Sequence, residues 1–67
     1  MKISRKDNPF CVIAGQKWKS KDSRRQRKFI VIQLEKCVNG YFALVEYDDT
    51  CHRMINLERF REYVRCK

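Results

Sequence analysis

Apolar and polar side chains alternate over short stretches of this chain, with the two-residue period of a half-buried β-strand. The segment Gln16-Lys17-Trp18-Lys19 alternates in this way and predicts a first strand in which Trp18 faces inward. Residues 28–38 and 41–47 are rich in β-branched and aromatic side chains, which favour strands over helices at these lengths. Residues 51–57 alternate again and predict a further strand with Ile55 and Leu57 on one face.

Turn-forming residues separate these segments. Residues 21–27 are polar throughout and predict a loop. Asn39-Gly40 predicts a hairpin with a type I′ turn, because both residues accept a positive φ. A second turn is expected at Asp48-Asp49-Thr50. A single helical turn is expected over 57–60, and a last short strand is expected over 63–66.

Four to five short antiparallel strands without an amphipathic helix predict an all-β fold. A chain of 67 residues has to curl such a sheet into a small barrel to bury one face and hide its edges. We therefore expect an SH3-like barrel over residues 14–67. An OB-type barrel fits less well, because it needs more residues and a helix. Residues 1–13 are expected to form a flexible basic N-terminal arm, of which Phe10 to Ile13 pack on the domain.

Charge is distributed unevenly along the chain, whose formal net charge is +8. Residues 1–28 carry ten basic and two acidic side chains, which gives +8, whereas residues 29–67 carry six of each. Seven basic residues lie between positions 17 and 28: Lys17, Lys19, Lys21, Arg24, Arg25, Arg27 and Lys28. A local excess of positive charge attracts polyanions such as nucleic acid or an acidic protein surface.

The four cysteines and the single histidine do not have the spacing of a metal site. Structural zinc sites usually take two ligands from one close Cys pair, whereas gaps of 25, 13 and 14 residues separate these cysteines. We therefore expect no metal and no cofactor, and we interpret the cysteines as reduced, small core side chains. With two glycines, no phosphate-binding loop and no catalytic constellation, the sequence predicts a protein that is not an enzyme.

No apolar run approaches the roughly 20 residues that are needed to span a bilayer. The apolar stretch Phe10 to Ala14 is also too short for the core of a signal peptide. The expectation is a cytoplasmic protein that does not bind membranes.

Two motifs resemble those of a group of small, largely uncharacterised bacterial and phage-borne proteins. The first is Gly15-Gln16-x-Trp18-x-x-x-Asp22-x-Arg24-Arg25, and the second is Ile55-x-Leu57-x-Arg59-Phe60. Between them, Gly40-Tyr41 matches the hairpin of the group, whereas Thr50-Cys51-His52 stands where the group usually has Thr-Gly-Arg. The resemblance covers residues 15–61 and implies an SH3-like fold and an origin on a phage or another mobile element.

Backbone-dominated nucleic-acid binding is the first functional hypothesis, because Lys and Arg neutralise phosphates and release counterions. The seven basic residues of 17–28 are its candidate contacts, and Tyr41 and Tyr47 are candidate stacking residues. Part of the motif has a structural interpretation instead: Asp22 is expected to pair with an arginine of its loop, and Arg59 with Glu35, Glu46 or Asp48. The alternative is a module that binds and modulates a host or phage protein through an acidic face. A basic run that only keeps the chain soluble remains a third interpretation.

Overall fold

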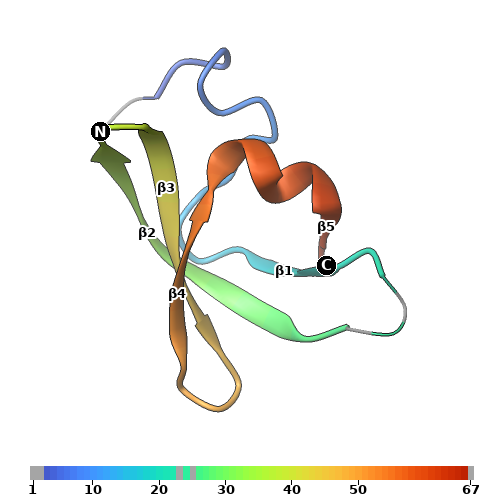
Figure 1. Ribbon diagram of the computed structural model, residues 1–67. Helices are drawn as coiled ribbons and strands as arrows, with labels where there is room; N and C mark the ends of the chain where they lie inside the picture. Colours follow the sequence, from blue (N-terminus) through green and yellow to red (C-terminus); the bar gives the residue numbers. More distant parts are fainter. Residues whose placement is uncertain (1–2, 23, 25, 67) are drawn as a thin grey trace.

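A computed structural model of the chain describes residues 3–22, 24 and 26–66. Five antiparallel strands form one open sheet in the order β4-β3-β2-β1-β5, and the fold is all-β and barrel-like, as the sequence predicts. The elements are β1 (Lys17–Ser20), β2 (Lys28–Cys37), β3 (Gly40–Tyr47), β4 (His52–Asn56), the 3-10 helix η2 (Leu57–Glu62) and β5 (Tyr63–Arg65). Figure 1 shows the long β2–β3 hairpin, with η2 lying between β4 and β5. Among the described residues, no helix is long and apolar enough to cross a membrane.

The β2–β3 hairpin exists, but its predicted turn type is wrong. Cys37 pairs with Gly40, so the two turn residues are Val38 and Asn39. Gly40 has a φ of +120°, whereas Asn39 is not among the residues with positive φ. A type I′ turn over Asn39-Gly40 needs positive φ at both positions, so the glycine alone provides the unusual backbone conformation here.

The turn between β3 and β4 places a threonine in the left-handed region. The Thr50 N–H donates to the Tyr47 carbonyl at 2.9 Å, and the Tyr47 N–H donates to the Cys51 carbonyl at 2.9 Å. This geometry gives Thr50 a φ of +65°, which is unfavourable for a β-branched residue. The turn is therefore closed by hydrogen bonds at the expense of local backbone strain.

Aromatic side chains dominate the core. The Trp18 and Phe60 rings meet edge to face with centroids 5.0 Å apart, and the Phe29 ring contacts those of Tyr47 and Tyr63 at 5.4 and 5.2 Å. Such pairs stabilise the fold beyond the area they bury. The other buried apolar residues are Val12, Val31, Ala43, Val45, Ile55 and Leu57.

Phe42 lies on the outward face of the sheet, although its side chain is large and aromatic. Its neighbour Ala43 is fully buried, and successive side chains of a strand point to opposite faces. The Phe42 side chain is half-buried and lies opposite Glu35 and Asn56 on the flanking strands.

The segment before β1 contributes to the core. Val12 is 1% exposed, and Asn8 holds it in place through both ends of its amide. The Asn8 Oδ1 accepts from the Val12 N–H at 2.9 Å, and Nδ2 donates to the Val12 carbonyl at 3.0 Å. Ile3 packs against the same core, so the core of the barrel includes residues upstream of position 14.

Gln16 explains part of the first motif in structural terms. Its Oε1 accepts from the indole N–H of Trp18 at 3.2 Å and from the Ile13 N–H at 2.9 Å. A buried indole N–H needs an acceptor, and Gln16, only two residues before Trp18, supplies it.

The interpretation of the cysteines as core residues is wrong. Cys11, Cys37 and Cys51 are exposed and Cys66 is half-buried, and all four are free thiols. They lie in loops or at the ends of strands, where the chain turns away from the core.

Candidate nucleic-acid interface

Three lysines lie on the outward face of the first two strands. Trp18 and Phe29 are paired across β1 and β2 and are both buried, so the residues on either side of them point outward. Lys19 lies directly opposite Lys28, and Lys17 lies two residues before Lys19 on the same face of β1. Like charges directly opposite each other in a sheet destabilise it, and none of these lysines forms an ion pair with a described residue. We call Lys17, Lys19 and Lys28 the lysine face.

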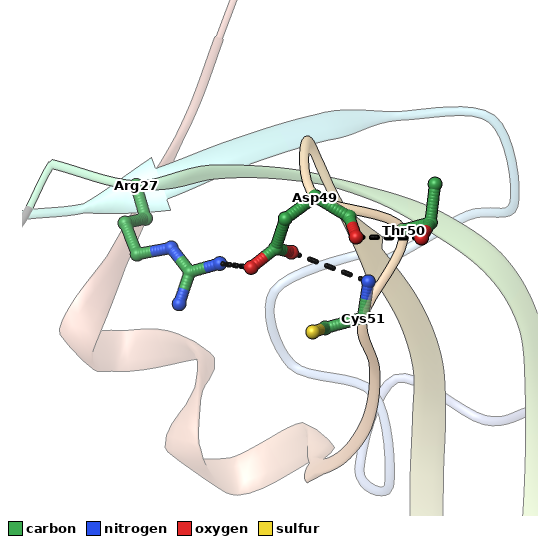
Figure 2. A network of polar contacts seen from close by, with 4 residues as sticks. All are labelled: Arg27, Asp49, Thr50 and Cys51. Atoms are coloured by element: carbon green, nitrogen blue, oxygen red, sulfur yellow. Dashed lines mark hydrogen bonds and ion pairs between the residues drawn. The ribbon is translucent and has the colours of Figure 1, made fainter.

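Arg27 differs from these lysines because the fold uses its charge internally. Its Nη2 donates to the Asp49 Oδ2 at 2.9 Å, and its guanidinium lies 4.5 Å from the centre of the Tyr47 ring. Figure 2 shows the Asp49 carboxylate between Arg27 and the backbone of Cys51. Arg27 therefore ties the β1–β2 loop to the β3–β4 turn.

Asp49 is held in its charged form by this network. The Cys51 N–H donates to its Oδ1 at 3.2 Å, and this bond is the main reason why the pKa of Asp49 lies below its ordinary value of 3.8. The Cys51 side chain and then the Arg27 charge lower it further. The same carboxylate raises the pKa of the Cys51 thiol above its ordinary value of 9.0. The Cys51 thiol therefore stays protonated at neutral pH, which does not suit a nucleophile.

The rest of the loop is fixed by backbone contacts. The Asp22 Oδ1 accepts from the Arg24 N–H at 2.9 Å, so Asp22 braces the loop through the main chain. Of the two arginines with which it was expected to pair, Arg24 forms no ion pair with it. The Lys21 N–H donates to the Glu62 carbonyl at 3.0 Å, which attaches the loop to η2. Arg24 and the Lys21 side chain are exposed, and Arg25 lies outside the described residues.

A hollow of about 650 Å³ opens between the β1–β2 loop and η2. We call it the basic hollow. It is lined by Ser20, Lys21, Asp22, Arg27, Tyr47, Arg53, Arg59, Glu62 and Tyr63. Lys19 and Lys28 form the last described pair of β1 and β2 before this loop, and neither of them lines the hollow. Four cations and two carboxylates among its lining residues leave a formal excess of two positive charges.

The two tyrosines proposed for stacking have different positions. Tyr47 is buried, with its ring against Phe29, so the prediction that it is an exposed stacking surface is wrong. Tyr41 is half-buried beside Lys36 at the opposite end of β3. Tyr41 and Tyr47 are six residue steps apart along β3, so their Cα atoms are about 20 Å apart. The fold therefore does not bring Tyr41 to the lysine face.

No family model, curated protein or solved structure matches this chain. The resemblance in the two motifs therefore stays an interpretation of the sequence. The functional argument rests on the charges and geometry described above.

Six residues of the basic hollow were not among the predicted contacts: Ser20, Asp22, Arg53, Arg59, Glu62 and Tyr63. Arg59 does not pair with Glu35, Glu46 or Asp48 as expected; its Nε lies 3.3 Å from the Glu62 Oε2. Glu46 lies beside His52 instead, and the His52 Nε2 is 3.2 Å from the Glu46 Oε1. No local sequence signal places Arg53, Arg59 and Tyr63 together, because β4, η2 and β5 bring them beside a loop some 30 residues earlier in the chain.

Proposed function

We propose that this protein binds the phosphate backbone of nucleic acid through the lysine face and the adjoining β1–β2 loop. The observation that supports the proposal best is the outward pairing of Lys19 and Lys28 with Lys17 beside them. Glu46 and Asp48 lie near Lys17 and Lys28, but no ion pair joins a described acidic side chain to any of the three lysines. A phosphate backbone would relieve the repulsion and release counterions.

The fold favours backbone contact over base readout. Lys17, Lys19 and Lys28 stand on a two-stranded surface that has no protruding helix to enter a groove. The large aromatic residues beside it, Trp18 and Phe29, are buried. We therefore infer binding of low sequence specificity, dominated by charge.

The salt dependence of binding tests this proposal. A fluorescently labelled oligonucleotide, as duplex DNA, single-stranded DNA or RNA, is titrated with the protein and read by anisotropy at several salt concentrations. The triple variant Lys17→Gln, Lys19→Gln, Lys28→Gln removes up to three phosphate contacts. On duplex DNA it is expected to make the slope of log affinity against log salt shallower by up to about 2.7, at about 0.9 for each contact.

A matched control carries the same loss of charge elsewhere. The control is the triple change to Gln of three exposed residues, Lys6, Lys36 and Arg61, so the two variants have the same net charge. None of these residues belongs to the lysine face or lines the basic hollow. Equal slopes for both variants would show that only net charge matters and would refute the assignment to the lysine face. Flat, weak binding of every strand type by the unmodified protein would refute nucleic-acid binding itself.

Binding to a protein is a second candidate function, and the outward face of β3 and β4 favours it. Leu44 and Met54 are paired there across the strands, and Met54 is 42% exposed. Ile30 and Phe42 are half-buried on the same outward side. Partly exposed apolar residues next to one another are typical of contact surfaces. A Met54→Lys change should leave nucleic-acid binding intact and abolish capture of a protein partner, if one binds here.

A further inference from the structure

The basic hollow has the charge of an anion site. Lys21, Arg27, Arg53 and Arg59 line it together with Asp22 and Glu62. Two of the arginines have an acidic partner: Arg27 pairs with Asp49 and Arg59 pairs with Glu62. Arg53 forms no ion pair with a described residue, so its guanidinium has donors that are available to a ligand.

Rigid aromatic packing supports the wall of the hollow. Tyr47 and Tyr63 both line it, and both rings pack against Phe29. The Arg27 guanidinium lies over the Tyr47 ring at 4.5 Å and is fixed from its other side by Asp49. A site whose walls are held in this way loses little conformational entropy when a ligand binds.

The Tyr63 hydroxyl adds a neutral donor to these cations. Burial raises the pKa of Tyr63 above its ordinary value of 10, with the negative field of Tyr47 as a further cause. The Tyr63 phenol therefore stays protonated at neutral pH and can donate a hydrogen bond to an oxyanion.

We propose that the basic hollow binds the terminal phosphate monoester of a nucleic-acid strand whose backbone follows the lysine face. This inference rests on the proposed function and makes it more specific. A phosphate monoester carries about −1.5 to −2 charge at pH 7 and presents three acceptor oxygens, which suits a hollow whose lining side chains carry more positive than negative charge. An internal phosphodiester carries a single charge and needs room for the strand to enter and leave. Arginine forks suit the oxygens of a terminal phosphate.

The first experiment compares oligonucleotides that differ only at their ends. One single-stranded sequence is prepared with a 5′-phosphate, with a 3′-phosphate and with hydroxyls at both ends, and the three compete for the protein at fixed salt. We expect one phosphorylated end to bind about tenfold more tightly than the hydroxyl form, as one added charge-assisted contact would give. Equal affinity for all three refutes the inference while leaving backbone binding by the lysine face in place.

Arg53 variants test the location of the site. Arg53→Gln should abolish the preference for the phosphorylated end, whereas Arg53→Lys should keep part of it. Arg61→Gln is the matched control, because Arg61 is an exposed arginine that does not line the hollow. A preference that survives Arg53→Gln unchanged places the phosphate elsewhere and overturns the assignment. Thermal melts of each variant confirm that the fold is retained.

Inorganic phosphate provides a probe that does not depend on the strand. In a ¹H–¹⁵N spectrum of the full chain, millimolar phosphate should shift the resonances of Arg53, Arg59 and Tyr63. The signal of Lys36, at the far end of β2, should stay in place. Shifts confined to the lysine face, or no saturable shift in the hollow, contradict a phosphate site there. If no oligonucleotide binds at all, the proposed function fails and this inference fails with it.

Discussion

Replacing Thr50 by glycine should stabilise the protein. Thr50 has a φ of +65° in the turn between β3 and β4, a conformation that costs an L-residue about 1–2 kcal/mol. Glycine adopts it freely, but loses about 0.5–1 kcal/mol more backbone entropy on folding. The exposed hydrogen bond from the Thr50 hydroxyl to the Asp49 carbonyl is also lost, and it contributes little in water. The net gain expected for Thr50→Gly is about 0.5–1 kcal/mol.

Thermal unfolding followed by circular dichroism measures this gain. A change of 1 kcal/mol shifts the Tm of a domain of this size by about 4–8 °C, so Thr50→Gly should raise it by about 2–8 °C. Thr50→Asn should also raise the Tm, because asparagine accepts a positive φ better than a β-branched residue. Thr50→Ala is the control, since it removes the hydroxyl and keeps an L-residue at the strained position. A Tm of Thr50→Gly at or below that of the unmodified protein would refute the argument from backbone strain.

Three further predictions concern the core, the first motif and the response to acid. Trp18→Ala should leave the chain largely unfolded at 25 °C. Losing a buried Trp costs about 3–5 kcal/mol, and the total free energy of unfolding expected for a chain of 67 residues is about 3–10 kcal/mol. A cooperative melt near the original Tm would contradict this. Gln16→Leu leaves the Trp18 indole N–H without its acceptor and should lower the free energy of unfolding by about 1–3 kcal/mol, as measured by urea denaturation. The contribution of Asp49 is fully present above its unfolded pKa near 3.8 and is lost as the pH falls through its lower folded value, because Cys51, chiefly through its backbone N–H, and then Arg27 favour the carboxylate. Urea midpoints below pH 4 should therefore fall more steeply for the unmodified protein than for Asp49→Asn, and parallel curves would argue against the pair.

Much of the fold follows from local patterns in the sequence. The alternation around Trp18 predicts β1, and the β-branched and aromatic segments predict β2 and β3, because side chains of a strand alternate between a buried and an exposed face. Ile55 and Leu57 are buried together as their spacing predicts, and the expected helical turn after β4 is η2. The concentration of positive charge in residues 17–28 is likewise a property of the sequence alone.

Only the tertiary structure decides which of those charges are available. Arg27 and Lys28 are neighbours in the sequence, yet Arg27 is paired with Asp49 from a turn 22 residues later, whereas Lys28 faces Lys19. Tyr47 is aromatic like Tyr41, but its position at the end of β3 beside Phe29 buries it. The basic hollow depends on β4, η2 and β5 lying beside the β1–β2 loop, so Arg53, Arg59 and Tyr63 gather there through long-range packing. The alternation of apolar and polar residues predicts which face of a strand is buried. It does not predict which distant segment covers that face, because that depends on long-range packing.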